Sequence, residues 1–368
     1  EPELRAELIA ALPWILLAVP VATLGGVFNG ALQSRQRFAE LNVIAVLGHA
    51  GVQLGPLVAA MLISPSLSLL VPVVLVARIV PLALSWQQCR KYVCEYAAMS
   101  FDWWVARDLL RFGGWVSVSA TVGPLMVVLD RFAIGVLMGA REVGYYTVPF
   151  QLAERATLLS AALNSALFPR FTAAVGAPRQ QLSKEAVRML SLLTTPAVAF
   201  GMLLIEPFLS WWVSPELTSV AGPAAQVLLL GFWVNSLAMV PYTQLHAAGR
   251  PDLVAKCHLV EVLPYLALLY AGLQFAGLVG AASVFALRAG VDFLVLAHLA
   301  GVMRSVVRGL LWPAAALLLL LFTQATSAMP APWPWVSGWL ICVLVFAWCA
   351  MHVHVEWRRV HGVVASAR

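Results

Sequence analysis

Charged residues are scarce in this chain of 368 residues, of which only 11% are Asp, Glu, Lys or Arg. A soluble domain carries roughly 25% charged residues, which keep its surface hydrated. The shortage of charge, together with 61% hydrophobic residues and a mean hydropathy of +0.87, excludes a water-exposed globular protein. The sequence therefore predicts an integral membrane protein.

Cysteine is also rare, and its spacing excludes two further classes. The five cysteines are Cys89, Cys94, Cys257, Cys342 and Cys349. They form no CxxC pair and no Cys/His cluster with metal-ligand spacing, so a disulfide scaffold, a zinc site and a redox dithiol are not supported. The sequence also has no Walker loop, HExxH motif, nucleophile elbow or glycine fingerprint. We therefore expect neither an enzyme nor a bound cofactor or metal.

Long apolar runs dominate the rest of the chain. A helix needs about 20 apolar residues to cross a bilayer core, and the chain has eleven such runs. They are rich in Leu and Ala and do not alternate with polar residues, which favours helices over a β-barrel. We expect an all-α fold with 11 transmembrane helices. The predicted ranges are 8–32, 41–64, 68–88, 111–139, 143–175, 184–212, 220–248, 253–275, 278–303, 306–326 and 333–355.

Basic residues between the runs predict the orientation in the membrane. Seventeen of the twenty-three Lys and Arg residues fall on one side, two fall on the other, and four lie within runs. The positive-inside rule assigns the seventeen-cation side, which includes the C-terminus, to the cytoplasm. The formal charge of +6 is thus an orientation signal, not a nucleic-acid surface. Eleven spans then place Glu1 outside without a signal peptide, so either the first span enters in reverse or upstream spans are missing.

A weak internal repeat relates two regions that lie about 210 residues apart. Segment 32–41 has the pattern of segment 245–254, in which a helix end is followed by a short basic turn. One span further along, Arg78 and Arg288 occupy equivalent positions inside the membrane. Such a repeat indicates two parallel bundles that face one another, which is the usual construction of an alternating-access transporter.

Ionisable residues inside the predicted spans are the candidate functional residues, because a charge at mid-bilayer costs at least about 2.5–3.5 kcal/mol. Arginine keeps its charge and offers a planar fork that suits phosphate. A cavity that contains the in-span arginines would therefore suit a pyrophosphate-linked or otherwise anionic cargo, and an amide could bind sugar hydroxyls. The candidate binding residues are Arg78, Arg131, Arg155, Arg288 and Asn164.

Structural roles are the alternative for each of these residues. Arg288 and Asp292 are four apart on one helical face, where they could neutralise each other as an ion pair. Amides such as Asn164 also tie membrane helices together, at about 0.6–2 kcal/mol each. Charges that converge on one cleft would favour transport, whereas charges dispersed among separately packed helices would favour a structural role.

The central segment 110–171 resembles a known family. Its motifs FGGW, LDRFAIG, VGYYTVPFQLAER and SALFPRF closely resemble the signature region of the polysaccharide flippases. These are the O-antigen or Wzx-type translocases of the MATE-like multidrug/oligosaccharidyl-lipid/polysaccharide exporter superfamily. Segment 2–38, which ends in GALQSRQRF, is similar to the fourth helix of those proteins, and the similarity weakens after Val306.

The resemblance implies a MATE-like two-bundle transporter fold that lacks about three N-terminal helices. Residues 1–95 would be the remainder of an N-terminal lobe, residues 96–303 a C-terminal six-helix lobe, and residues 304–368 two further spans and a cytoplasmic tail. The implied function is a flippase that moves undecaprenyl-pyrophosphate-linked oligosaccharides across the bacterial inner membrane by alternating access. This step serves O-antigen, capsule or exopolysaccharide synthesis, so the implied protein partners are a polysaccharide polymerase and a chain-length regulator.

The motif positions also imply site residues. Asp130 and Arg131 of LDRF and Glu154 and Arg155 of QLAER are expected to line the cavity, and Asp130, Glu154 and Asp292 to couple transport to a proton or cation gradient. Two other transporters fit the same fold. A lipid II flippase carries a cargo with the same lipid pyrophosphate, whereas a multidrug or cation antiporter should have an acidic, aromatic cleft, which the in-span arginines disfavour. A non-transporting scaffold is the third alternative.

Overall fold

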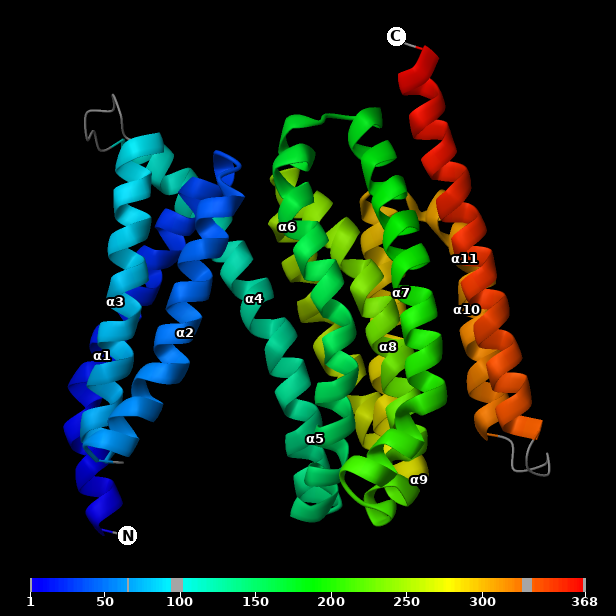
Figure 1. Ribbon diagram of the computed structural model, residues 1–368, viewed down its shortest axis with the longest axis horizontal. Coiled ribbons are helices and arrows are strands. Elements are labelled where there is room, and N and C mark those ends of the chain that lie inside the picture. Colours follow the sequence, from blue (N-terminus) through cyan, green and yellow to red (C-terminus); the bar gives the residue numbers. More distant parts are fainter. Residues whose placement is uncertain (1, 65, 94–101, 326–332, 367–368) are drawn as a thin grey trace. The chain divides into compact units, whose positions relative to one another are not determined.

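The computed structural model describes residues 2–64, 66–93, 102–325 and 333–366, which are helical apart from short turns and contain no strand (Figure 1). This arrangement confirms the predicted all-α class. The helices are α1 (Pro2–Ser34), α2 (Phe38–Leu62), α3 (Leu67–Tyr92), α4 (Trp103–Leu137), α5 (Ala140–Glu154), the 3₁₀ turn η1 (Arg155–Thr157), α6 (Leu158–Ala173), α7 (Ala177–Trp212), α8 (Pro215–Ala247), α9 (Pro251–Leu299), α10 (Met303–Ala325) and α11 (Trp333–Ser366).

The chain divides into two compact units, Glu1–Asp102 and Trp103–Arg368. In the first unit, α3 packs along both α1 and α2. The hydroxyl of Ser85 on α3 donates a hydrogen bond to Oδ1 of Asn29 on α1 at 3.1 Å. Polar bonds of this kind tie helices together in a membrane, where apolar packing alone gives little preference for protein over lipid.

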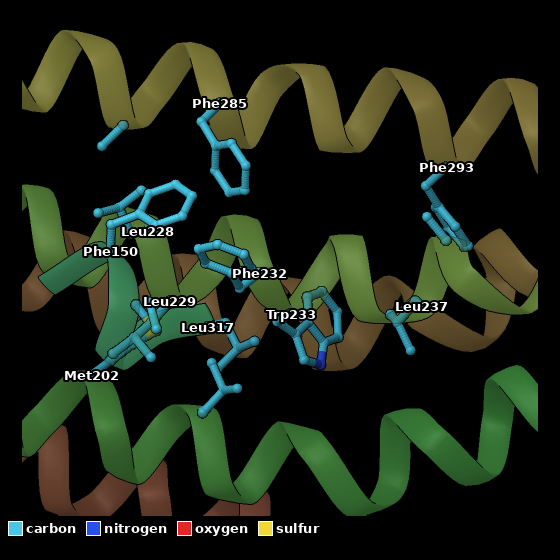
Figure 2. Close-up of a cluster of buried hydrophobic side chains, with 14 of the residues drawn as sticks. Phe150, Met202, Leu228, Leu229, Phe232, Trp233, Leu237, Phe285, Phe293 and Leu317 are labelled. Atoms are coloured by element: carbon cyan, nitrogen blue, oxygen red, sulfur yellow. The ribbon is translucent and has the colours of Figure 1, made fainter. Parts of the chain in front are cut away.

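Helix α8 lies at the centre of the second unit and packs against α5, α6, α7 and α9. The ring of Phe232 on α8 lies 4.9 Å from that of Phe150 on α5 and 4.7 Å from that of Phe285 on α9 (Figure 2). All three rings are buried. Helices α10 and α11 pack on α7. The aromatic core therefore fixes α5 and α9 on α8, next to the charged residues described below.

Helix α9 consists of two helical arms that lie side by side. Ala276 and Gly277 have non-helical backbone angles, and Gly277 has a φ of +54°, which glycine adopts without steric penalty. The arms approach so closely that a Cβ on Gly280 would collide with the backbone carbonyl of Gly272. The turn falls where the sequence predicts the boundary between two spans.

Nine helices among the described residues are long and apolar enough to cross a membrane. The predicted number of eleven is therefore not confirmed. The difference arises at two places. The 49 residues of α9 count once although they contain two arms. Helices α5 and α6, which follow one another through η1 across the predicted span 143–175, are too short to count separately.

Local sequence signals set both ends of α8. At its start, the hydroxyl oxygen of Ser214 accepts a hydrogen bond from the backbone N–H of Leu217 at 3.1 Å, which satisfies one of the donors left free at a helix N-terminus. At its end, Gly249 has a φ of +74° and donates its N–H to the carbonyl of His246 at 3.0 Å. This glycine closes the helix in the manner of a Schellman motif.

Candidate functional site

Ionisable side chains gather between α4 and the two arms of α9, inside the second unit. We call this group the α4–α9 polar cluster, and it consists of Asp130, Arg131, His258, Glu261, Tyr265, Arg288 and Asp292. Asp130, His258, Tyr265 and Asp292 are buried, and the other three are half-buried. Because isolated charges are costly inside a membrane, a group of this kind must be partnered internally or by a ligand.

Asp130 links α4 to α9. Its side chain is fully buried, and its Oδ1 accepts a hydrogen bond from the hydroxyl of Tyr265. Arg131 and Arg288 both lie near enough to act on it electrostatically. Its Oδ2 is buried without a hydrogen-bond partner among the described residues. The carboxylate therefore holds two helices together and keeps one oxygen available.

The two arginines of the cluster lie against aromatic rings. The Cζ of Arg131 is 4.5 Å from the centre of the Phe150 ring, and that of Arg288 is 5.6 Å from the Tyr265 ring and 5.7 Å from the Phe285 ring. These distances are within the range of cation–π attraction. In both arginines Nε is buried with no acceptor in the described part of the chain. Each guanidinium is thus oriented by aromatic faces and retains hydrogen-bonding capacity.

The second arm of α9 brings Asp292 opposite His258. Oδ1 of Asp292 lies 3.7 Å from Nε2 of His258, which is too far for a hydrogen bond. Both carboxylate oxygens of Glu261 are buried and lack a partner within the described ranges. Arg288 acts electrostatically on both acids, but among the described residues it forms no direct ion pair with Asp292. The cluster is therefore a polar site whose charges are close but incompletely paired.

The structure brings part of the predicted site together. The predicted residues that meet in the cluster are Asp130, Arg131, Arg288 and Asp292. Asn164 is buried on α6, where its Nδ2 donates to the carbonyl of Ser160 at 2.7 Å. Its Oδ1 has no partner among the described residues. The amide is therefore half-satisfied by its own helix and keeps one acceptor, and its proposed contact with sugar stays a prediction.

The other predicted residues lie elsewhere. Glu154 and Arg155 are exposed where α5 meets η1, outside the cluster. Arg78 lies in the first unit, where it lines a groove of about 670 Å³ together with Asn29 and His49. The roles proposed for these residues stay predictions, and each would have to meet a ligand at a surface or groove of its own unit.

Sequence reasoning missed Tyr265, although the pattern on α9 contains a usable signal. His258, Glu261 and Tyr265 are spaced i, i+3, i+7, which places them on one face of a helix. Arg288 and Asp292 are four apart on the second arm. Two polar stripes on consecutive spans predict that the spans face each other, and a tyrosine in such a stripe is a candidate partner for a buried acid.

Comparison with known proteins identifies the family. Residues 5–221 match the family model described as polysaccharide biosynthesis protein. The chain belongs to this family. A Shigella flexneri protein named as an O-antigen transporter is 28% identical over 79% of the chain and 70% of its own length. The Bacillus subtilis teichuronic acid biosynthesis protein TuaB is 25% identical over 79% of the chain and 60% of its own length. A Haloferax volcanii protein named as a low-salt glycan biosynthesis flippase is 25% identical over 52% of the chain and 42% of its own length.

Solved structures confirm the fold of this polysaccharide biosynthesis protein. A MATE protein in complex with MaL6 superposes with a TM-score of 0.65 at 15% identity, covering 84% of the chain and 70% of that structure. The lipid II flippase MurJ in an inward closed conformation superposes with a TM-score of 0.55 at 13% identity, covering 92% of the chain and 72% of that structure. The predicted MATE-like fold is therefore confirmed. The family match over residues 5–221 confirms the resemblance carried by the motifs of segment 110–171.

Proposed function

We propose that this chain is a flippase for lipid-linked oligosaccharides, which it moves from the cytoplasmic to the periplasmic leaflet for O-antigen, capsule or exopolysaccharide synthesis. The observation that carries the proposal is the α4–α9 polar cluster, in which two arginines retain buried donors that find no acceptor among the described residues. The names of the relatives, an O-antigen transporter and a glycan biosynthesis flippase, support a saccharide cargo. The cargo proposed is an oligosaccharide on undecaprenyl pyrophosphate.

The arginines suit the pyrophosphate. Arg131 and Arg288 are held against aromatic rings, so their planar donor groups are oriented before a ligand arrives. A guanidinium binds phosphate oxygens through two parallel hydrogen bonds, and these are stronger in an apolar surrounding than in water. Arg155 on the surface of the second unit and Arg78 in the groove of the first would supply further contacts as the head group passes.

The lipid tail would remain in the bilayer while the head group moves through the protein. Alternating access would expose the head-group site first to one side of the membrane and then to the other. Fold similarity to a MATE protein and to MurJ is consistent with this mode of transport. Asn164 retains a buried acceptor that would bind a sugar hydroxyl.

Coupling to a gradient would use the buried acids. A proton or cation at Asp130 would change its hydrogen bond with Tyr265 and so the packing of α4 on α9. Asp292, which faces His258, offers a second site of the same kind. Glu154 is exposed, so it would act at the surface of the second unit.

The proposed location is the bacterial inner membrane with the C-terminus in the cytoplasm. The bias of seventeen basic residues to one side supports this orientation. A flippase placed in this way would deliver its product to a polysaccharide polymerase and a chain-length regulator on the periplasmic side. A lipid II cargo is less favoured, because the likeness to MurJ concerns the fold, whereas the relatives in sequence are named for saccharide polymers and glycans.

Complementation of a strain that lacks its polysaccharide flippase tests the proposal. We expect the intact gene to restore surface polysaccharide and the Arg131→Ala variant to fail at normal expression. Arg141→Ala is the matched control, because Arg141 is exposed and contacts the exposed Glu216 and the ring of Tyr145 outside the cluster, and such surface pairs contribute little. Normal polymer in cells that express Arg131→Ala would contradict the proposed role of the cluster.

A further inference from the structure

A second charged pocket, of about 450 Å³, lies between α7, α10 and α11 and shares no residue with the α4–α9 polar cluster. We call it the α7–α11 pocket. Its basic and aromatic lining residues are Lys184, Arg188, Arg308, Trp312, Trp348 and His352. Neither the family membership nor the transport proposal gives this pocket a role.

Each of the three helices contributes a pair of side chains spaced i, i+4, which places both members on one face. The pairs are Lys184 with Arg188 on α7, Arg308 with Trp312 on α10, and Trp348 with His352 on α11. The faces that carry these pairs turn toward one pocket. Polar or aromatic faces of α7, α10 and α11 therefore meet at a single site.

The aromatic side chains form one wall of the pocket. The rings of Trp312 and Trp348 lie 6.5 Å apart in an edge-to-face arrangement. The imidazole of His352 lies 4.3 Å from the Trp348 ring, and its Nδ1 is 2.9 Å from the carbonyl oxygen of Trp348. Leu192 and Leu310 add apolar surface. An occupant therefore meets aromatic and aliphatic groups as well as charge.

The charge of the pocket is positive. Among the described residues that line it, three side chains are cationic and one, Glu185, is acidic. Oε1 of Glu185 already accepts a hydrogen bond from Nε2 of Gln181 at 2.7 Å. The site therefore attracts an anion.

The position of the pocket indicates where the anion comes from. Its walls are the beginnings of α7 and α10 and the middle of α11, toward the side with seventeen basic residues. Tryptophan prefers the depth of the lipid headgroups, and basic pockets between membrane helices on the cytoplasmic side suit anionic lipid headgroups. We propose that the α7–α11 pocket binds the phosphate headgroup of an anionic phospholipid of that leaflet, with the acyl chains along Leu192 and Leu310. This inference does not depend on the cargo of the flippase.

Native mass spectrometry of the purified full chain tests the site with defined probes. Dioleoyl-phosphatidylglycerol is titrated against dioleoyl-phosphatidylcholine, which has the same chains and no net charge, and against free glycerol phosphate. We expect tighter binding of phosphatidylglycerol than of either other probe. The double variant Lys184→Gln/Arg308→Gln should weaken that binding by about 25-fold, or about fivefold for each cation removed. Arg304→Gln is the matched control, because Arg304 lies on α10 and does not line the pocket.

Four results would overturn the proposal. They are equal binding of the two lipids, unchanged binding in the double variant, equal loss in Arg304→Gln, and displacement of the lipid by equimolar glycerol phosphate. If the double variant does not fold, the salt dependence of phosphatidylglycerol binding to the unmodified protein tests the proposal instead. Binding that weakens as salt rises from 0.05 to about 0.5 M supports the site, because salt screens the headgroup from the cations. Binding that is insensitive to salt refutes it.

Discussion

The hydroxyl of Tyr265 on α9 donates a hydrogen bond to Asp130 on α4, across 135 positions of the sequence. Both side chains are buried, so water cannot replace the bond. Arg131 follows Asp130 on α4, and Arg288 lies over the ring of Tyr265. The bond therefore holds together the two elements that present the arginines of the α4–α9 polar cluster.

Removal of the Tyr265 hydroxyl should loosen this contact. In Tyr265→Phe, both oxygens of Asp130 would be buried without a hydrogen-bond donor among the described residues. A buried group left unsatisfied costs about 1–3 kcal/mol, so we expect a lower melting temperature in detergent and reduced transport. Tyr270→Phe on the same helix is the control, because Tyr270 is 58% exposed. Equal melting temperatures for the two variants would show that the bond is not stabilising.

The helices and their breaks could largely be predicted from sequence. Apolar runs of sufficient length are visible directly, and glycine marks several breaks, as at Gly249 after α8 and at Gly277 within α9. The 3₁₀ turn η1 was not predicted, because Arg155–Thr157 contains neither glycine nor proline. It interrupts the predicted span 143–175 at its middle.

The candidate site could be predicted only in part. A charge within an apolar run is evident in the sequence, but on α4 and α5 the face on which it lies is not, because these two helices give little periodic signal. Asp130 and Glu154 therefore look alike in sequence, although one is buried and the other exposed. Tyr265 lies on one face of α9 with His258 and Glu261, but its partner Asp130, 135 positions away, is evident only in the structure.

Close packing of the two arms of α9 predicts a strong effect at one glycine. A methyl group at Gly280 would overlap the backbone carbonyl of Gly272, which cannot move without displacing an arm. Overpacking of this kind costs about 1–3 kcal/mol or more, so Gly280→Ala should unfold at a lower temperature. Gly290→Ala lies on the same helix, and a Cβ there meets nothing within 4 Å. If both variants melt like the unmodified protein, the arms are not in close contact.

The core of the second unit contains a polar bond that can be tested with two adjacent threonines. Nε1 of Trp233 donates to Oγ1 of Thr195 at 3.1 Å, which joins α8 to α7. Within the described part of the chain, the hydroxyl of Thr194 donates to the carbonyl of Leu190 in its own helix and to no other helix. Thr195→Val should therefore destabilise the protein by about 0.6–1.7 kcal/mol, measured by unfolding in a denaturing detergent, and Thr194→Val by less. The reverse order would contradict the assigned bond.

Neutral variants of Asp130 and Glu154 should show which of these two motif acids is needed for transport. Asp130→Asn keeps the size of the side chain and an oxygen that accepts from Tyr265, but it removes the charge that faces Arg131 and Arg288. Loss of one partner from a buried set of charges costs about 2–5 kcal/mol, so transport should fall by about tenfold or more. Glu154→Gln removes an exposed charge and leaves no buried group unpaired, so its effect should be smaller. Surface polysaccharide per molecule of expressed protein measures both variants, and the melting temperature of each purified variant separates a loss of transport from a loss of folded protein. A larger defect in Glu154→Gln would place the coupling group at the surface of the second unit instead of in the cluster.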